Sequence, residues 1–509
     1  MIAGTHPILT CAAARELEAK LFGADEVKEW AAMQQAGAAI AEAVLRDFAE
    51  IGGFPPDGRI LVLAGKGHNG GDALIASRQI IERFPSATVE VEFAFGQRAL
   101  RPLAARAWRE LLQTAPERVR GSAAALGRSA ELPPSFAAAD YDLCLDGVFG
   151  FQFRPPCDPR TAALLEQVNA LPIPLRAAVD LPSAGIFRAD FTYATGSVKA
   201  PIVDDLNAGR IRYLDLGFFS PVAGVVDPGP AILRVLTPAM LAPLAALRPA
   251  RCDKRSYGHL FVLGGSRSYP GAVMMAVEAA LRSGAGLVTA FVPETLAAAF
   301  AARLPEAIWV GWPETPDGSL ALEGLHLLRE RLSRADALVV GPGIGREAET
   351  LALVGEIVRL GDKPVLLDAD ALQPDIVRAA KSPLVVTPHA GEFARIAPNA
   401  SLEDFVRTSR ATVVLKGPVT RIGTTDGDAA VIYHSFAGGP VLARGGSGDL
   451  LAGMIGAQLA QSPTDPALAA ARGVLWHGLA ADRLARARGQ VAVHTTQLLD
   501  HLGAMLRGL

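Results

Sequence analysis

The sequence predicts an α/β protein with two doubly wound domains, each built on a parallel sheet that helices cover on both faces. Short apolar runs typical of buried strands alternate with Ala- and Leu-rich stretches of helical character along the whole chain. At 509 residues the chain is too long for a single hydrophobic core. Several strand-like runs are followed at once by glycines, so we expect the binding sites at the strand ends.

The composition favours small-molecule ligands. Hydrophobic residues make up 50% of the chain and charged residues 20%, and the net charge is −3. No basic block is present, so nucleic acid is not an expected partner. The four cysteines are scattered without a C-x-x-C pair, which argues against a disulfide framework and a zinc site. Because there is neither a basic leader nor an apolar run of membrane-spanning length, we expect a cytoplasmic protein without a membrane partner.

A change in composition marks the expected domain boundary. The stretch 218–251 is rich in Pro, Ala and Gly, and it follows an apolar run at 211–216 that we interpret as a last strand. We therefore predict a first domain at 1–225, a linker at 226–250 and a second domain at 251–509. The two halves carry different motifs and no repeat, which indicates a fusion and not a duplication.

A glycine-rich loop follows the first clear strand of the N-terminal half. The strand is predicted at 60–64, and Gly65-Lys-Gly-His-Asn-Gly-Gly-Asp72 leads from it into a helix. This is the G-x-G-x-x-G arrangement of a Rossmann-like domain. Further strands of this half are predicted at 89–93, 141–145 and 176–179.

Polar side chains are expected at three strand ends of this half. Asp146 and Asp180 each follow an apolar run directly, while Asn69 and Ser183 lie in the loops after strands. Asn69, Asp146 and Ser183 would converge on one hard cation with oxygen ligands. The alternative for either carboxylate is a solvated residue that caps the next element.

The C-terminal half continues the alternation of strands and helices. The loop Gly264–Gly271 and the turn Gly341-Pro-Gly-Ile-Gly345 each follow a strand and let a ligand approach the backbone. The strands of this half are predicted at 260–263, 337–340, 365–367, 384–387 and 412–415.

Charged residues follow the last three of these strands. Asp368 and Asp370 would point to the same side if their strand continued, where they could hold magnesium or act as caps. His389 can contact a ligand or have a purely structural role. Lys416 can bind phosphate or lie at a surface turn. A Walker A motif is absent, so a nucleotide would not be held in P-loop fashion.

Asp449 is the strongest catalytic candidate. It stands in Arg444-Gly-Gly-Ser-Gly-Asp-Leu450, at the start of a long apolar stretch that predicts a helix. Backbone amides at a glycine-rich helix start form an anion site, in which a carboxylate can take the proton of a hydroxyl that attacks a phosphoryl group. The alternative is that Asp449 simply caps the helix.

The N-terminal motifs, together with Met33-Gln-Gln-Ala-Gly37, resemble the epimerase domain of the NAD(P)HX repair enzymes over residues 10–220. That domain inverts position 6 of hydrated NADH and NADPH, abbreviated NADHX and NADPHX. The resemblance implies that Asn69, Asp146 and Ser183 bind K⁺ and that Asp180 is catalytic. It further implies that the substrate is bound by His68, Asn69, Gly70, Gly71, Asp72, Gly150, Phe151, Gln152, Phe153, Arg154, Pro155, Pro156 and Asp180.

Two loops depart from the pattern of that family. Gly150-Phe151-Gln152 replaces its usual Gly-Thr-Gly, and Pro182-Ser183-Ala184-Gly185 replaces its Pro-Ser-Gly-Leu. Both changes fall in the substrate loops.

The C-terminal motifs resemble the ribokinase-like superfamily, and within it the ADP- or ATP-dependent NAD(P)HX dehydratases, from Tyr257 to near the end of the chain. The motifs include Gly341–Gly345, Thr387–Glu392 and Gly445–Asp449. The resemblance implies that Ala272, Gly343, His389 and Asp449 bind the hydrated cofactor. The residues that it places against the nucleotide are Lys416, Gly417, Pro418, Val419, Thr420 and Gly448.

The resemblance implies a reaction in which Asp449 activates the hydroxyl at position 6 for phosphorylation by ADP or ATP. Mg²⁺ would bridge the phosphates of the nucleotide, and the phosphate would then leave the substrate. The family acts on the S epimer, and an epimerase on the same chain would supply it from the R form. We also expect a homo-oligomer. The alternative function is a ribokinase-like kinase for a small vitamin alcohol, with a non-catalytic N-terminal ligand-binding domain.

Overall fold

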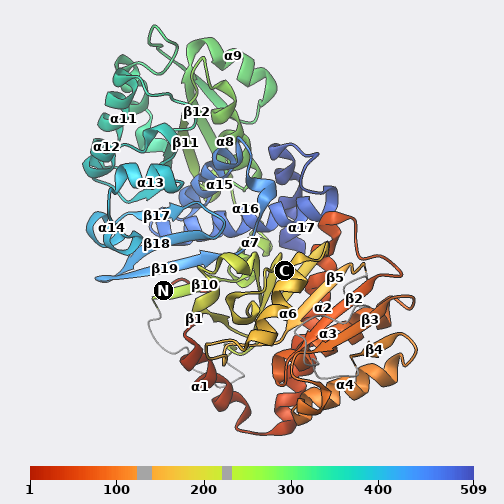
Figure 1. The fold of residues 1–509 in the computed structure, drawn as a ribbon. Coiled ribbons are helices and arrows are strands. Elements are labelled where there is room, and N and C mark those ends of the chain that lie inside the picture. Colours follow the sequence, from red (N-terminus) through yellow and green to blue (C-terminus); the bar gives the residue numbers. More distant parts are fainter. Residues whose placement is uncertain (123–139, 221–231, 509) are drawn as a thin grey trace. The chain divides into compact units, whose positions relative to one another are not determined.

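The computed structural model describes residues 1–122, 140–220 and 232–508. The chain divides into two compact units, His6–Pro230 and the combination of Met1–Thr5 with Ala231–Leu509. The predicted α/β class is confirmed for both (Figure 1). Within the described ranges, no helix has the length and apolar character needed to cross a membrane.

The N-terminal unit is a parallel sheet with the strand order β4-β3-β2-β5-β6-β7-β9. A short parallel pair joins β1 to β8. The strands are β1 (Thr5–Leu9), β2 (Arg59–Ala64), β3 (Thr88–Phe93), β4 (Val119–Gly121), β5 (Leu143–Gly147), β6 (Leu175–Val179), β7 (Phe191–Thr195), β8 (Val198–Lys199) and β9 (Arg210–Leu214).

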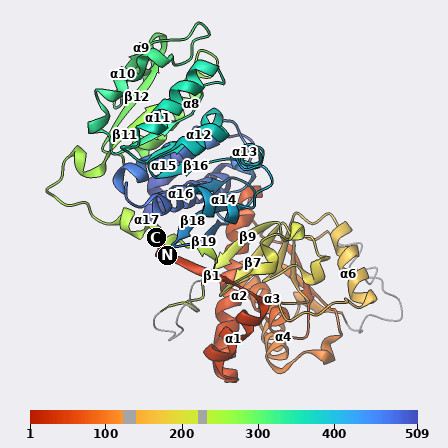
Figure 2. The same ribbon diagram turned by 90° about the vertical axis from the view of Figure 1, so that its left-hand side faces the viewer.

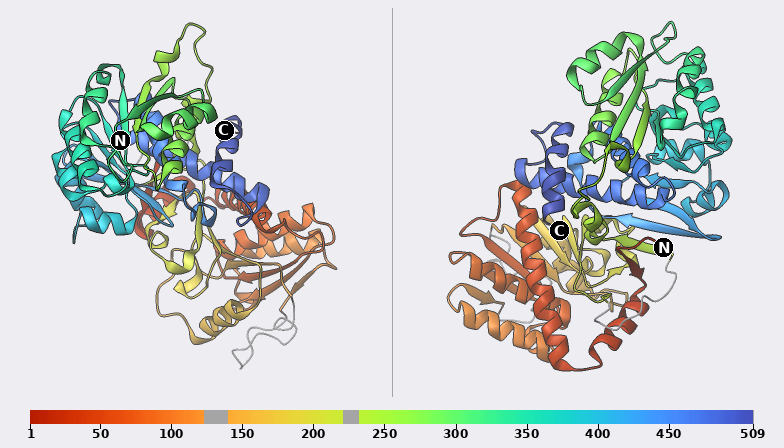
Figure 3. Two further views of the ribbon diagram at one scale, coloured as in Figure 1. Left: turned by 90° about the horizontal axis from the view of Figure 1, so that it is seen from above. Right: turned by 180° about the vertical axis from the view of Figure 1, so that it is seen from behind.

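Helices cover both faces of this sheet. One core joins α2, α3 and α4 to the sheet, and a second core joins α6 to the opposite face (Figure 2). The view from behind shows α2 as the long red helix of this unit (Figure 3). The helices are α1 (Cys11–Phe22), α2 (Glu26–Phe48), α3 (His68–Arg83), α4 (Pro102–Thr114) and α6 (Pro159–Ala170).

The C-terminal unit contains a larger sheet with the strand order β13-β12-β11-β14-β15-β16-β17-β18-β19-β10. Its neighbouring strands are parallel except for the antiparallel pairs that β18 makes with β17 and β19. The strands are β10 (Leu233–Leu236), β11 (His259–Leu263), β12 (Leu287–Pro293), β13 (Ile308–Trp312), β14 (Ala337–Val340), β15 (Val365–Leu367), β16 (Leu384–Val386), β17 (Thr412–Leu415), β18 (Thr420–Asp426) and β19 (Ala429–Ser435).

Two groups of helices enclose this sheet. The core on one face includes α8, α15 and α16, and the core on the other includes α11, α12 and α14 (Figure 1). The helices are α7 (Ala242–Ala245), α8 (Pro270–Arg282), α9 (Glu294–Arg303), α10 (Leu325–Arg329), α11 (Ala348–Leu360), α12 (Pro374–Ala379), α13 (Ala390–Ile396), α14 (Leu402–Ser409), α15 (Ser447–Gln461), α16 (Pro466–Arg488) and α17 (Leu502–Arg507).

The predicted linker at 226–250 contains regular structure at 233–245, while its part at 226–231 lies outside the described residues. Strand β10 pairs in parallel with β19 and buries Arg234, Val235 and Leu236. The predicted first domain at 1–225 also needs correction. Met1–Thr5 belong to the C-terminal unit, where the backbone amide of Ile2 donates to the Tyr433 hydroxyl over 3.2 Å.

Candidate active sites

In the C-terminal unit, three neighbouring strands bring charged and polar side chains together at their carboxyl ends. Asp368 follows β15, Thr387 follows β16 and Lys416 follows β17. The Asp368 Oδ1 atom accepts from the Thr387 hydroxyl at 2.7 Å and lies 3.0 Å from the Lys416 ammonium. Burial alone would lower the pKa of Lys416, but the carboxylates of Asp368 and Glu392 outweigh it and raise that pKa. The lysine is therefore held charged.

The expected alignment of Asp368 with Asp370 is wrong. The strand ends at Leu367, and the short 3₁₀ helix Ala369–Ala371 turns the chain. Asp370 therefore pairs with Arg346, whose Nε lies 2.7 Å from Oδ1, whereas Asp368 faces Lys416. The two carboxylates do not form a pair.

His389 caps α13 and lies beside Lys416. Its Nδ1 atom accepts from the amides of Gly391 at 3.0 Å and Glu392 at 3.2 Å, and its own amide donates to Glu392 Oε2 at 2.8 Å. A backbone bridge pairs His389 with Lys416. Because Nδ1 accepts, Nε2 carries the proton in this network. The exposed imidazole is thus fixed in orientation, and its Nε2 atom lies 3.5 Å from Glu392 Oε1.

Asp449 lies in the first turn of α15, where the expected helix is confirmed. Gly446 caps the helix in the left-handed conformation, and the amides of Gly446, Gly448 and Asp449 donate to no residue that the structure describes. A Cβ placed on Gly448 would lie 3.4 Å from the Lys416 Nζ atom. The glycine amides and the ammonium therefore bound one anion site.

The environment of Asp449 raises its pKa to about 7. Burial is the largest cause, the carboxylate of Asp368 acts in the same direction, and Lys416 opposes both. A carboxyl group with a pKa near neutrality is suited to general acid–base catalysis.

The two remaining predicted substrate residues lie together on a neighbouring loop and helix. Gly343 has a φ of 72°, and a Cβ there would lie 2.5 Å from the Tyr269 carbonyl oxygen and 3.0 Å from the Ala272 Cβ. Ala272 stands in the first turn of α8, which packs against α15, and a Cβ on Gly446 would meet Met275 of α8 at 2.6 Å. Gly417, Pro418 and Val419 form the turn between β17 and β18, and Thr420 is the first residue of β18.

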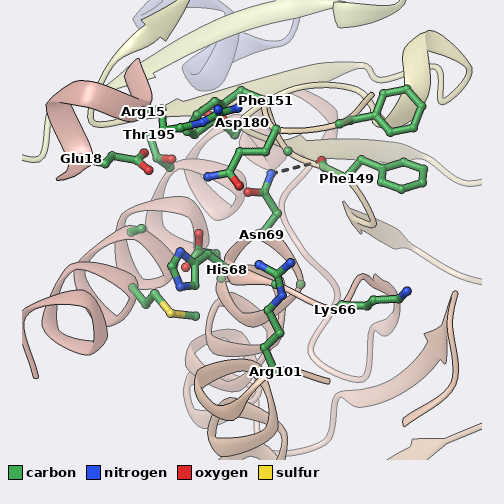
Figure 4. Close-up of a pocket in the computed structure, with 18 of the residues that line it drawn as sticks. Arg15, Glu18, Lys66, His68, Asn69, Arg101, Phe149, Phe151, Asp180 and Thr195 are labelled. Atoms are coloured by element: carbon green, nitrogen blue, oxygen red, sulfur yellow. Dashed lines mark hydrogen bonds between the residues drawn. The ribbon is translucent and has the colours of Figure 1, made fainter. Parts of the chain in front are cut away.

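The N-terminal unit contains a cavity of about 790 Å³ at the carboxyl ends of its strands (Figure 4). Asn69 lies near the middle of this view, Glu18 and Asp180 lie on one side of it and Arg101 lies on the other. Gly71 and Pro155 are not in the lining. The predicted epimerase residues that line the cavity are His68, Asn69, Gly70, Asp72, Gly150, Phe151, Gln152, Phe153, Arg154, Pro156 and Asp180.

Asp180 forms a buried ion pair in this cavity. Its φ is 68°, and its Oδ1 atom lies 2.5 Å from the ammonium of Lys199, which also donates to the Thr195 carbonyl at 3.1 Å. Burial raises the pKa of Asp180, and Lys199 offsets part of this effect. Lys199 was not among the predicted site residues, although a lysine between the apolar residues Val198 and Ala200 was a usable signal.

Two further carboxyl groups of the cavity have raised pKa values. Burial, followed by the charges of Asp180 and Glu18, raises the pKa of Asp72 well above its ordinary range. Burial raises the pKa of Glu18 to about 7, with Lys199 opposing and Asp180 adding to the shift. Glu18 belongs to α1, which was not expected to contribute to the site.

Asp146 and Ser183 contact each other directly, and Asn69 of the cavity lining binds the backbone next to them. The Ser183 hydroxyl donates to Asp146 Oδ1 at 2.6 Å, and the Asn69 amide donates to the carbonyls of Val179 at 2.9 Å and Phe149 at 3.2 Å. Burial raises the pKa of Asp146 to about 6, and no lysine or arginine of the described residues pairs with it. A buried carboxylate among hydroxyl and carbonyl oxygens is a donor set that fits a hard cation.

Ala184 and Phe151, which depart from the family pattern, differ in what surrounds them in the structure. Ala184 has a φ of 58°, a conformation in which glycine is the usual residue, so the substitution retains the turn with some strain. The Phe151 ring lies 5.2 Å from the Lys199 ammonium and forms part of the cavity wall.

Two family models match the chain in succession. Residues 30–203 match the YjeF-related protein N-terminus, and residues 260–503 match NAD(P)H-hydrate dehydratase. The bifunctional NAD(P)H-hydrate repair enzyme Nnr of Gloeobacter violaceus is 36% identical over 94% of this chain and 93% of its own. The chain belongs to this family of bifunctional repair enzymes. Another member, from Moorella thermoacetica, is 33% identical over 94% of this chain and 92% of its own.

Solved structures also resemble about half of the chain. The ADP/ATP-dependent NAD(P)H-hydrate dehydratase of Bacillus subtilis, co-crystallised with ATP and Mg²⁺, covers 53% of this chain and 97% of its own at 28% identity and a TM-score of 0.47. A ribokinase-like protein of Enterococcus faecalis covers 54% of this chain and 96% of its own at 29% identity and a TM-score of 0.47.

Proposed function

We propose that the C-terminal unit dehydrates S-NADHX or S-NADPHX with consumption of ADP or ATP, and that the N-terminal unit interconverts the R and S epimers. The observation that carries the first half is Asp449, a carboxyl group of neutral pKa among free amides and a charged lysine. Membership of the bifunctional repair family supports both halves.

In the dehydration, Asp449 removes the proton of the hydroxyl at position 6 while that oxygen attacks the terminal phosphoryl group of the nucleotide. The bond to the leaving nucleotide breaks, which releases AMP from ADP or ADP from ATP. The substrate phosphate then leaves as the ring nitrogen donates its electron pair, and loss of a proton from position 5 restores the double bond of NADH or NADPH. The free amides of α15 and Lys416 stabilise the phosphoryl oxygens during transfer.

Mg²⁺ is part of this proposal as the partner of the nucleotide phosphates. Asp368 Oδ1 is engaged by Thr387 and Lys416, and Glu392 Oε2 accepts from the His389 amide. Phosphate oxygens would therefore supply most of the ligands, and the ion would neutralise charge there.

In the epimerisation, position 6 is a carbon that carries both a hydroxyl and the ring nitrogen, so opening and reclosing of the ring inverts it. We propose that Asp180, held by Lys199, takes the hydroxyl proton as the bond between this carbon and nitrogen breaks and an aldehyde forms. A protonated carboxyl group of the cavity, Glu18 or Asp72, supplies the proton to the nitrogen. The reverse steps on the other face complete the inversion.

The proposal also includes K⁺, assembly and location. K⁺ would be bound by Asn69, Asp146 and Ser183, where it would balance the buried carboxylate and order the loop after β5. The protein would act in the cytoplasm as a homo-oligomer, as we expected from the sequence.

The decisive experiment supplies a defined mixture of R and S hydrates with ADP or ATP and follows NADH and free phosphate. Equal amounts of both products support the dehydratase. A phosphorylated product that retains the phosphate would contradict it and favour a kinase.

A further inference from the structure

Two basic residues stand at one end of the N-terminal cavity, away from the catalytic carboxyl groups. Lys66 and Arg101 both line the cavity, and the Arg101 amide donates to the Lys66 carbonyl at 2.9 Å. In Figure 4 the Arg101 guanidinium rises beside the start of α3, opposite the side on which Glu18 and Asp180 lie. An Arg101 guanidinium nitrogen lies 3.9 Å from the position that a Cβ would take on Gly67.

These two cations are not neutralised by the protein. Among the residues that the structure describes, no carboxylate forms an ion pair with either of them. The Lys66 ammonium lies 4.3 Å from the centre of the Phe95 ring, which orients it without cancelling its charge. Lys199, in contrast, is paired with Asp180.

The backbone between them adds further donors. Helix α3 starts after Gly67 without a side-chain cap, and the amides of His68, Asn69 and Gly70 donate to no residue in the described part of the chain. Such amides at a helix start favour an anion. Asp72 also lines the cavity, at 7% exposure, and its Oδ1 atom has no hydrogen-bond partner among the described residues, but the charges of Asp180 and Glu18 act on it, so it belongs with the catalytic carboxyl groups and not with this end.

The size of the cavity indicates which part of a ligand reaches this end. A volume of about 790 Å³ is in the range of pockets that hold a whole drug-sized molecule, well beyond a single nicotinamide ring. With the ring beside Asp180, the rest of a dinucleotide extends toward Arg101. The groups of a dinucleotide that match two unpaired cations and a helix start are its phosphates.

We propose that Lys66 and Arg101 form a phosphate subsite that holds the hydrated dinucleotide during epimerisation. This inference rests on the proposed epimerase function and adds a determinant of affinity to it. The phosphate is either the bridging diphosphate, present in NADHX and NADPHX alike, or the 2′-phosphate of NADPHX.

The test compares full-length Lys66→Gln and Arg101→Gln with the wild-type chain. Without ADP or ATP the dehydratase is idle, so chromatographic separation of the epimers reports only their interconversion, above the rate without enzyme. We expect each substitution to raise KM by about 10- to 100-fold with kcat within about 2-fold, as for the loss of a charge-assisted hydrogen bond. Both side chains are exposed, so folding should be unaffected.

Arg98→Gln is the matched control, because Arg98 is exposed on the same connection but does not line the cavity. Equal loss with NADHX and NADPHX supports the diphosphate, and loss confined to NADPHX supports the 2′-phosphate. Unchanged KM for both substrates, or a fall in kcat at constant KM, would overturn the subsite.

Equilibrium binding of NADPH separates this inference from the function on which it rests. If the wild-type chain never interconverts the epimers, yet the double variant Lys66→Gln with Arg101→Gln loses one NADPH site, the subsite stands and the epimerase proposal fails. If interconversion occurs but the double variant binds NADPH and turns over as the wild type does, the subsite alone is wrong.

Discussion

The charge state of Asp449 depends first on its burial and then on two neighbours of opposite sign. Asp368 disfavours its ionised form and Lys416 favours it, while Asp368 and Lys416 also pair with each other at 3.0 Å. The three groups therefore respond together to any substitution.

Replacement of Asp449 by Asn should reduce dehydratase turnover by at least ~100-fold if it is the base, because the amide cannot accept the proton. Nucleotide binding should persist, since the glycine amides and Lys416 remain. Parallel measurement of NADH formation and of ADP affinity tests this. Unchanged turnover would exclude Asp449 as the base.

The dehydratase rate should rise as the pH increases through about 7, because the base works only in its ionised form. Asp368→Asn removes a negative neighbour, so the pKa of Asp449 should fall and the midpoint of kcat against pH should move to lower pH. Asp370→Asn is the control, since Asp370 pairs with Arg346 instead. A midpoint that stays or moves upward in Asp368→Asn would contradict this account.

Lys199→Met should leave the buried Asp180 without its cation and destabilise the N-terminal unit by about 3–5 kcal/mol. Denaturant unfolding of the full chain measures the change. The double variant Lys199→Met with Asp180→Asn should recover much of the stability, because no buried charge remains. Failure of this recovery would show that packing of the lysine stem dominates.

The residues of the C-terminal site were more predictable than those of the cavity. Asp449, Lys416 and His389 each follow a strand or a glycine run that is visible in the sequence. Lys199 and Glu18 reach the cavity only through tertiary packing, from a two-residue strand and from the first helix. A local pattern carries no information on such a contact.

At the scale of elements, the predicted strands form with ends shifted by at most two residues. Buried parallel strands read as continuous apolar runs, which makes β2, β14 and β17 easy to recognise. The antiparallel strand β18 was not predicted, because Thr-Arg-Ile-Gly-Thr-Thr-Asp is mostly polar and partly exposed.

Two glycines at the start of α15 should differ in their tolerance of alanine. Gly446 has a φ of 89°, and its Cβ would meet Met275 at 2.6 Å, so Gly446→Ala should lower stability by roughly 1–3 kcal/mol. Gly448→Ala should preserve stability but displace Lys416 and slow dehydration. Thermal unfolding and turnover of both variants test this, and equal loss of stability in the two would refute it.

At the scale of the whole molecule, the two activities should combine on a mixture of epimers. The wild-type chain with ATP should convert all of the R and S hydrate to NADH. Asp180→Asn should convert the S fraction at the normal rate and leave the R fraction to its slow spontaneous inversion. The time course of NADH measures this, and complete rapid conversion by the variant would contradict the role of Asp180.

The first residues of the chain complete the unit that contains its last ones. Gly4 accepts at its carbonyl from the Thr237 amide at 3.0 Å, and the Thr5 hydroxyl accepts from Arg234 at 2.8 Å. In the sequence, the epimerase unit is therefore an insertion within the dehydratase unit. During synthesis the inserted unit would be complete before the C-terminal unit, so Met1–Thr5 could contact their partners in that unit only later. Cutting the gene at the apparent boundary would thus deprive the dehydratase of part of its own framework.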